Sequence, residues 1–322
     1  MKAIRFEKTG GPEVLRYTDV DLPPPGPGQV RVRHTAIGVN FIDTYHRSGL
    51  YKVALPSGLG SEAAGVVDAL GEGVARPGIG ERVAYAGTMG AYAEANNVPA
   101  DGLVAIPEGI SDETAAAALL KGMTAQYLLM RTYSVNPAET ILFHAAAGGV
   151  GLIACQWARH LGATVIGTVG SADKMALARE NGCAHVLNTR KDDWVARVRE
   201  ITGGEGVPVV YDSIGKDTWN GSLDCLAVRG MMVSFGNASG AVPAFEPGML
   251  SAKGSLYLTR PTLLHYTRTR EELQDTANEL FAVIASGAVK IAVNQRFRLA
   301  DAAAAHEALH ARATTGATVL LP

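Results

Sequence analysis

Cysteine is scarce in this sequence. The 322 residues contain three cysteines, Cys155, Cys183 and Cys225, so none lies in the first 154 positions. An odd number without a CxxC spacing argues against a disulfide framework and against a cysteine-rich metal site. We therefore expect reduced thiols that pack as small hydrophobic side chains in a reducing compartment.

An excess of charge and long apolar runs are also lacking. The formal net charge is −2, from 29 basic and 31 acidic residues, so the composition offers no basic surface for nucleic acid or for an acidic membrane. No uninterrupted apolar run reaches the roughly 18 residues of a membrane span. Residues 1–7 alternate charge and hydrophobe like an edge strand and lack the apolar segment of a signal peptide. We expect a cytoplasmic protein with no nucleic-acid or membrane partner.

The strongest pattern present is a βαβ unit around a glycine-rich turn. An apolar run at residues 141–143 precedes the turn at 148–151, and apolar side chains then recur at helical spacing over 150–161. Residues 163–169 form a second apolar run. Strand, glycine turn, helix and strand follow one another, which is the order of a dinucleotide-binding unit.

The glycine turn has nearly the spacing of a dinucleotide fingerprint. It reads Ala145-x-x-Gly148-x-x-Gly151, with alanine in place of the first glycine. Glycines allow backbone N–H groups to approach a pyrophosphate over the positive end of the helix dipole. Taken alone, the motif is also compatible with a helix start packed closely on a strand, but the flanking elements favour the dinucleotide site.

The end of the second strand indicates which dinucleotide is bound. An NAD site needs an acidic residue about 20 residues past the fingerprint, whereas an NADP site needs a cation there instead. The strand ends in Val169-Gly170-Ser171, and Lys174 follows within one helical turn. A hydroxyl and a positive charge suit a 2′-phosphate, so the sequence predicts NADPH. Asp173 leaves NAD open if the turn differs, and Lys174 is also compatible with an ordinary solvated helix lysine.

The first 120 or so residues predict a β-rich lobe of short strands separated by glycine and proline. Residues 30–34 alternate with period two, so one face of that strand should be buried. Ser111 is expected to cap a helix that runs to Leu120. Lys121-Gly122 is expected to end this helix, and residues 124–131 to form a second one.

Strands and helices alternate after the dinucleotide unit, which requires a parallel sheet covered on both faces. The expected strands lie at 184–188, 207–212, 230–235 and 254–259, the last at the sheet edge, and the expected helices between them at 192–201 and 218–226. The tail predicts a helix after a capping box at Thr269, a helix over 300–311 and a final strand over 317–321 that should pair into an existing sheet.

Six motifs in fixed order carry a family resemblance over almost the full length. They are Gly38-Val-Asn-Phe-Ile-Asp43, Gly60-Ser-Glu-Ala-Ala-Gly65, Gly80-Glu-Arg-Val83, His144-Ala-Ala-Ala-Gly-Gly-Val-Gly151, Val209-Val-Tyr-Asp-Ser213 and Ser234-Phe-Gly-Asn237. With these motifs the chain resembles the medium-chain dehydrogenase/reductase superfamily. Within it, the chain is most similar to the zeta-crystallin-like NADPH:quinone oxidoreductases, particularly the bacterial type.

The resemblance implies an α/β fold made of two domains. A GroES-like, β-rich catalytic domain would cover residues 1–123 and be completed by a return segment over 261–322. A doubly wound parallel-sheet Rossmann domain would cover residues 124–260 and bind NADPH. The resemblance also implies a substrate cleft where the domains meet and a homodimer joined through the edge strand at 254–259.

Site residues follow from the resemblance position by position. Asn40 matches a residue near the nicotinamide, and Tyr45 and Tyr51 match tyrosines on the substrate side, although both could merely pack the cleft wall. The cofactor contacts implied are Asn40, Thr124, Gly148, Gly149, Val150, Ser171, Lys174, Phe235 and Asn237, with Arg260 and Arg312 as weaker candidates. Thr189 replaces a tyrosine that relatives often place beside the 2′-phosphate.

The zinc alcohol dehydrogenases of the same superfamily provide a contrast. Their catalytic zinc needs a cysteine and a histidine at positions where this sequence has Asn40 and Ser61. We therefore expect no metal and a zinc-independent reduction of a small-molecule quinone by hydride from nicotinamide C4. The alternatives are reduction of α,β-unsaturated carbonyls and, in a different class, a crystallin-like NADPH-binding structural protein.

Overall fold

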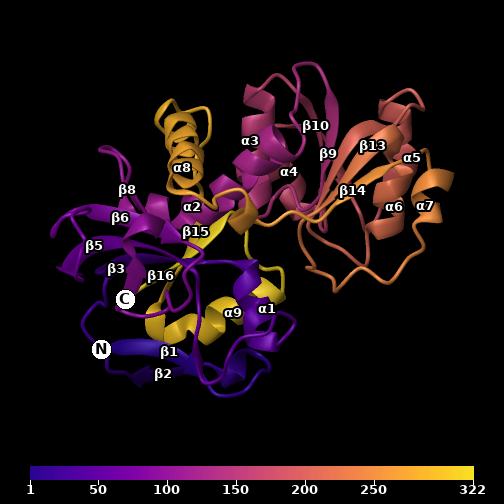
Figure 1. The fold of residues 1–322 in the computed structure, drawn as a ribbon. Coiled ribbons are helices and arrows are strands. Elements are labelled where there is room, and N and C mark those ends of the chain that lie inside the picture. The colour runs from indigo at the N-terminus through magenta and orange to yellow at the C-terminus, as the bar shows by residue number, and fades with distance from the viewer. The chain divides into compact units, whose positions relative to one another are not determined.

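The computed structural model describes all 322 residues and contains two compact units (Figure 1). Unit 1 comprises Met1–Met123, Thr267–Ala285 and Ile291–Pro322, and unit 2 comprises Thr124–Tyr266 and Ser286–Lys290. No helix of the structure is both long and apolar enough to cross a membrane.

Unit 1 is built on two β-sheets. The larger has the order β15-β16-β3-β5-β6-β8, with β7 also paired to β3, and the smaller has the order β2-β1-β4. The strands are β1 (Lys2–Phe6), β2 (Arg16–Asp19), β3 (Gln29–Val39), β4 (Ser57–Gly58), β5 (Glu62–Leu70), β6 (Arg82–Ala86), β7 (Ala95–Pro99), β8 (Leu103–Ala105), β15 (Val293–Arg298) and β16 (Ala317–Leu321). The helices are α1 (Phe41–Ser48), α8 (Arg270–Ala285), α9 (Ala302–His310) and most of α2 (Asp112–Gln126), whose last turn enters unit 2.

Strand β3 confirms the period-two prediction. Val30, Val32 and His34 are buried, whereas Arg31 is half-buried and Arg33 is exposed. The last strand, β16, pairs antiparallel with β3, which confirms that the C-terminal strand joins an existing sheet. Its other neighbour, β15, lies in a segment for which the sequence predicted no strand.

The prediction of an N-terminal edge strand was wrong. Strand β1 is the central strand of its sheet, paired antiparallel with β2 on one side and with β4 on the other. The alternation of Lys2, Ala3, Ile4, Arg5 and Phe6 reports which face is buried, but it carries no information on how many strands pair with the backbone.

The predicted break at Lys121-Gly122 was also wrong. Helix α2 runs without interruption from Asp112 to Gln126, and a π-helical segment continues it over Tyr127–Thr132. A Cβ built on Gly122 would lie 2.3 Å from Cδ1 of Leu280 in α8. The glycine therefore allows close packing of two helices and does not terminate α2. The predicted cap is confirmed, because the N–H of Thr114 donates to Oγ of Ser111.

Unit 2 contains a six-stranded, all-parallel sheet in the order β11-β10-β9-β12-β13-β14. The strands are β9 (Thr140–Phe143), β10 (Thr164–Val169), β11 (Cys183–Asn188), β12 (Val207–Asp212), β13 (Leu226–Ser234) and β14 (Tyr257–Thr259), and the helices are α3 (Gly149–His160), α4 (Asp173–Glu180), α5 (Trp194–Ile201), α6 (Trp219–Asp224) and α7 (Gly248–Ala252). Strand, turn, helix and strand around the glycines are confirmed, as is the edge position of the last strand. The predicted helix over 218–226 ends early, because Leu226 already begins β13.

Both faces of this sheet are covered, as predicted. Side chains of α5 and α6, including Val198 and Leu223, pack with Leu142, Ile166 and Val210 of the strands. Figure 1 shows α3 and α4 on the opposite side of the sheet. The strand order reverses between β9 and β12, and in sheets of this kind ligands bind beyond the carboxyl ends of the strands at that point.

Candidate functional site

The glycine turn after β9 is shaped for an anion. Gly148 is the N-cap of α3, and Gly149 and Val150 are its first two helical residues. A glycine has no side chain to cap the N–H groups of this first turn. The first N–H groups of a helix have no acceptor within it and bind anions well. A Cβ on Gly151 would lie 2.3 Å from the carbonyl oxygen of Ala145, so only glycine lets α3 begin this close to the turn.

Ala145 occupies the place of the missing first glycine. Its φ is +54°, in the left-handed region that glycine adopts most readily. The backbone thus keeps the conformation that a glycine would take, although the residue is alanine. At this position the turn therefore departs from glycine in its side chain and not in its backbone conformation.

Buried polar side chains tie the turn to the neighbouring strands. His144 places Nδ1 2.8 Å from Oγ1 of Thr168 and Nε2 3.0 Å from Oγ of Ser222. Ser222 in turn donates to Asp212 at 2.7 Å. Burial lowers the pKa of His144, so its imidazole is neutral at pH 7. Ser222 is fully buried and therefore out of reach of a substrate, so it is not a nucleophile. The hydrogen bonds among His144, Thr168, Ser222 and Asp212 hold the strand ends together.

The end of β10 carries the residues predicted for the 2′-phosphate. The N–H of Lys174 donates to the carbonyl oxygen of Ser171 at 3.4 Å, so the two follow one another in a single turn. Asp173 is exposed, and a hydrogen bond from the Ser171 side chain lowers the pKa of its carboxyl group. Thr189 is anchored here as well, because its N–H donates to the carbonyl oxygen of Val169 at 3.0 Å.

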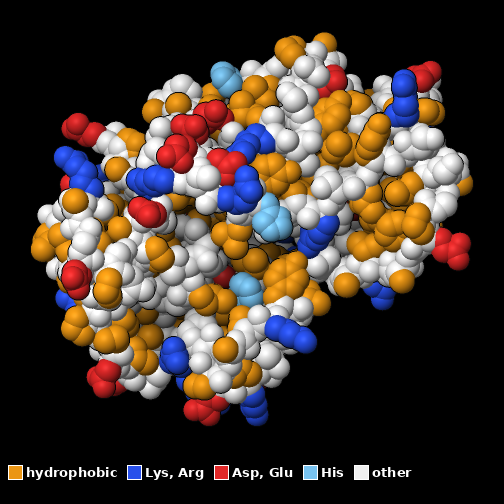
Figure 2. Space-filling model, in the orientation of Figure 1, with side chains coloured by type: hydrophobic (Ala, Val, Ile, Leu, Met, Phe, Trp, Pro, Cys, Tyr) orange, Lys and Arg blue, Asp and Glu red, His pale blue; other side chains and the backbone are white.

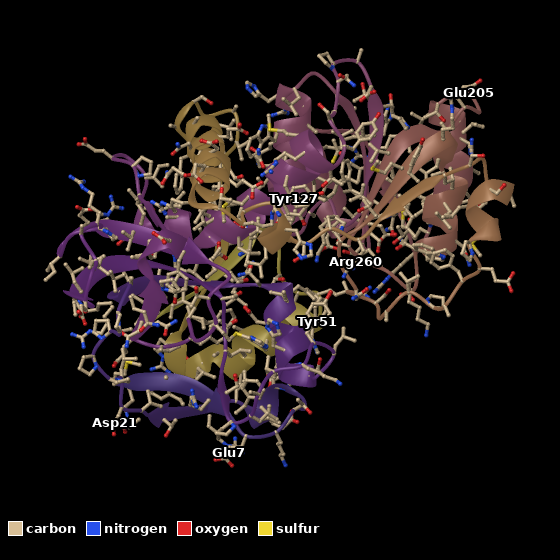
Figure 3. The ribbon with its side chains drawn as sticks, in the orientation of Figure 1. Glu7, Asp21, Tyr51, Tyr127, Glu205 and Arg260 are labelled. Atoms are coloured by element: carbon tan, nitrogen blue, oxygen red, sulfur yellow. The ribbon has the colours of Figure 1, made fainter.

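Phe235 and Asn237 follow β13 at the same edge of the sheet. The ring of Phe235 lies 5.8 Å from that of Phe143 at the end of β9. Arg260, labelled in Figure 3, donates from Nη1 to the carbonyl oxygen of Ser234 at 2.7 Å, and its Nη2 lies 3.2 Å from the amide oxygen of Asn237 in the orientation that satisfies the amide. Unit 2 therefore brings the predicted cofactor residues after β9, β10 and β13 to one edge.

Unit 1 brings together the residues predicted for the reacting centre. Asn40 is the N-cap of α1, and Tyr45 lies on that helix. The N–H of Tyr51 donates to the carbonyl oxygen of Tyr45, and the two rings meet edge to face with centroids 5.1 Å apart. The ring of Phe41 also meets that of Tyr45 edge to face, with centroids 5.6 Å apart.

Asn40 is held by a buried carboxyl group behind it. Its backbone N–H donates to Oδ2 of Asp43 at 2.8 Å, and Tyr92 donates to the same oxygen at 2.9 Å. Desolvation by burial raises the pKa of Asp43 to about 7. Nε2 of His306 lies 3.0 Å from Oη of Tyr92, and Nδ1 of His306 lies 3.1 Å from Nη1 of Arg47. Since arginine only donates, Nδ1 accepts and Nε2 carries the proton.

A buried ion pair lies on the other side of Asn40. Lys121 and Glu62 are 5% and 0% exposed, and Nζ lies 3.1 Å from Oε2. The amide nitrogen of Asn40 donates to that same Oε2 at 2.8 Å, and the backbone N–H of Leu120 donates to Oε1 at 2.6 Å. Every oxygen of this carboxylate therefore has at least one donor.

Zinc does not suit these donors. The places where zinc alcohol dehydrogenases carry ligands hold Asn40, whose amide binds Glu62, and Ser61, whose buried hydroxyl has no hydrogen-bond partner. The ammonium of Lys121 binds the same carboxylate oxygen as the Asn40 amide, and zinc prefers thiolate and imidazole. No group of three or more histidine, cysteine, aspartate or glutamate side chains is placed to hold a metal ion.

The sequence interpretation missed Glu62 and Lys121. Both interrupt apolar runs, Glu62 in Gly60-Ser-Glu-Ala-Ala-Gly65 and Lys121 in Ala115-Ala-Ala-Ala-Leu-Leu-Lys121. Charged side chains in such runs are almost never fully buried unless they are paired, so the two charges signalled a pair. Two further predicted residues come from other elements: Thr124 lies in the last turn of α2, and Arg312 follows α9 in unit 1.

Comparison with known proteins identifies the class. The model described as "Alcohol dehydrogenase GroES-like domain" matches residues 26–108, and that described as "Zinc-binding dehydrogenase" matches residues 149–284. The fold is thus that of a medium-chain dehydrogenase/reductase with a GroES-like and a Rossmann-type domain, which confirms the predicted fold class.

The similar proteins narrow this to one family. The quinone oxidoreductase of Pseudomonas aeruginosa is 58% identical over 100% of this chain and 99% of its own. The crystal structure of Escherichia coli quinone oxidoreductase complexed with NADPH has a TM-score of 0.99 and 54% identity, with both chains fully covered. The 2-haloacrylate reductase of a Burkholderia species is 48% identical over 98% of both chains. The chain belongs to the quinone oxidoreductase family.

Proposed function

We propose that this chain is a zinc-independent, NADPH-dependent quinone reductase that transfers hydride directly from nicotinamide C4 to a quinone. The observation that carries the proposal is the glycine turn at the start of α3 in unit 2. It lies in a chain that matches, over its full length, a relative crystallised with NADPH. NADPH supplies the hydride when it is bound; the chain binds, orients and shields the reactants.

The cofactor is assigned to the edge of the sheet in unit 2. The N–H groups of Gly149 and Val150 at the start of α3 suit the pyrophosphate. The hydroxyl of Ser171 and the ammonium of Lys174 suit the 2′-phosphate. Contacts from Gly148, Thr124, Phe235 and Asn237 remain predictions from the family resemblance.

The substrate is assigned to unit 1, beside Asn40, Tyr45 and Tyr51. A quinone that accepts a hydride becomes a hydroquinone anion and needs one proton, which water can deliver. The phenol groups of Tyr45 and Tyr51 would donate hydrogen bonds to the quinone oxygen on which the negative charge develops. Asn40 is the residue that the family resemblance assigns to the nicotinamide.

We further propose a cytoplasmic homodimer joined through β14. This strand is the edge of the sheet in unit 2, and an unpaired edge readily accepts another strand. Tyr257 on β14 and Val228 are 60% and 74% exposed. Figure 2 shows hydrophobic side chains gathered over this part of unit 2, on the right of the view.

A second candidate is reduction of α,β-unsaturated carbonyl compounds. The relative that favours it is the 2-haloacrylate reductase, which is nearly half identical to this chain over almost its full length. Hydride addition to an activated carbon–carbon double bond needs the same cofactor and the same geometry. A nucleotide-binding protein without activity is the third possibility, and it predicts binding of NADPH with no turnover.

Stopped-flow measurement of NADPH absorbance distinguishes the three. We expect oxidation of NADPH by 1,4-benzoquinone or naphthoquinones, faster than by an enone or 2-chloroacrylate, and unchanged rates after treatment with a zinc chelator. Faster turnover of the unsaturated acids would assign the second function. Binding without oxidation by any acceptor would assign the third, and loss of activity on removal of bound zinc would contradict the proposal.

A further inference from the structure

We infer that Glu62 and Lys121 form a positioning pair, which fixes the side-chain amide of Asn40 and thereby sets the rate of hydride transfer. The inference rests on the proposed function, in which Asn40 contacts the nicotinamide. Glu62 and Lys121 themselves would touch neither reactant, so they act through Asn40.

The contacts favour a precise orientation of the amide. Oε2 of Glu62 accepts hydrogen bonds from the amide nitrogen of Asn40 at 2.8 Å and from the ammonium of Lys121 at 3.1 Å. The other hydrogen of the Asn40 amide points towards the carbonyl oxygen of Gly38, at 3.5 Å from the nitrogen. The backbone of Asn40 is fixed independently by Asp43. Both the main chain and the side chain of Asn40 are therefore restrained.

The surrounding backbone is shaped around the Glu62 carboxylate. A Cβ on Gly38 would lie 2.2 Å from Oε2 of Glu62 and 2.3 Å from the carbonyl oxygen of Ala116. Any larger residue at position 38 would displace the carboxylate that holds Asn40, two positions further along the chain. The motif Gly38-Val-Asn40 therefore makes space for Glu62 and supplies the side chain that Glu62 orients.

Fold stability by itself is a poor explanation for this pair. Two charges removed from water lose their hydration, and well-packed apolar residues of similar size commonly stabilise a protein as well or better. The carboxylate contributes something that an apolar side chain lacks, namely an acceptor for the Asn40 amide. The positive charge of Lys121 compensates the negative charge of this buried carboxylate.

The test compares two double variants that both remove the buried charges. In Glu62→Gln/Lys121→Met one amide oxygen remains at position 62 to accept from Asn40, while the hydrogen bond from the N–H of Leu120 is lost in both double variants. In Glu62→Leu/Lys121→Met the volume is similar but the acceptor is gone. Each pair of changes is also made together with Asn40→Ala, and thermal unfolding confirms that all variants are folded.

We expect the leucine variant to have a kcat for quinone reduction roughly tenfold or more below that of the glutamine variant, because small misplacement of reactants slows the chemical step strongly. The dissociation constant for NADPH should agree within about twofold, since the phosphate contacts lie in unit 2. In the Asn40→Ala background the kcat difference should vanish. Equal kcat values in the two double variants, or a difference that persists without Asn40, would overturn the inference.

A second readout separates this inference from the proposed function. The fluorescence of bound NADPH reports the surroundings of the nicotinamide and needs no acceptor. We expect the leucine variant, and not the glutamine variant, to shift this emission from that of the unmodified protein. If the unmodified protein binds NADPH without reducing quinones, the proposed function fails, whereas identical spectra for the two double variants would still refute the positioning pair.

Discussion

Lys174 is the residue on which the predicted choice of cofactor depends. It follows Ser171 in the turn after β10, where the ribose end of a dinucleotide lies in folds of this type. The neighbouring Asp173 is exposed, and its lowered pKa keeps it ionised at neutral pH. The two side chains favour opposite cofactors, because a carboxylate repels a 2′-phosphate and accepts hydrogen bonds from ribose hydroxyls.

Two single variants separate these effects. Lys174→Ala should raise the Michaelis constant for NADPH several-fold and leave that for NADH almost unchanged, because only NADPH carries the phosphate. Asp173→Asn is the matched control and should not raise the Michaelis constant for NADPH. Steady-state kinetics with both cofactors measures this; equal effects of Lys174→Ala on both would remove the argument for phosphate recognition.

Helix α2 is the element in which sequence and structure differ most instructively. Glycine usually weakens a helix interior by up to about 1 kcal/mol, so Gly122 reads locally as a break. In the structure it faces Leu280 of α8, which is fully buried. The close approach of two helices more than 150 positions apart in the sequence explains the glycine.

Gly122→Val tests this packing. The added side chain would overlap Leu280, so we expect the free energy of unfolding to fall by about 1–3 kcal/mol. In a Leu280→Ala background the same change should cost less or stabilise, because the valine fills part of the cavity. Urea unfolding of the four proteins measures the coupling, and additive effects would show that the two residues do not pack together.

At the scale of the whole molecule, buried histidines link stability to pH. Burial lowers the pKa of His34 to about 4 and that of His306 to about 3, so both are neutral in the folded state at pH 5, where the unfolded chain binds a proton at each. Above about pH 6.5 both states carry neutral histidines and these groups cost no stability. As the pH falls below that value, only the unfolded chain binds the protons, so the free energy of unfolding decreases. Asp43 acts in the opposite direction between about pH 4 and 7, because its raised pKa makes the folded state the better proton binder.

We therefore expect the unfolding free energy to fall as the pH is lowered from 6.5 towards 4. His306→Gln keeps an acceptor for Arg47 and a donor for Tyr92 without a titrating group. This variant should reduce the pH dependence by about 1.4 kcal/mol per pH unit in that range, the value for one proton. Denaturant unfolding at pH 4.5, 5 and 5.5 provides the measurement. An unchanged slope would show that His306 does not remain neutral in the folded protein.

The sequence by itself determined the βαβ unit, the parallel sheet and the place of the glycine turn. Those signals are local: apolar periodicity distinguishes strand from helix, and glycine spacing marks the turn where a backbone must approach a phosphate. Short strands separated by glycine and proline predicted the β-rich lobe. The family motifs added the roles of Asn40, Tyr45 and Tyr51, which stay predictions.

Only the tertiary structure decided which distant groups meet. In the fold, β1 is a central strand and Gly122 packs closely against another helix instead of ending its own. Glu62 forms an ion pair with Lys121, 59 positions later, and the same carboxylate binds Asn40. The physical reason is that pairing partners, close packing and buried charge compensation depend on atoms brought together by the fold, and local periodicity carries no record of them.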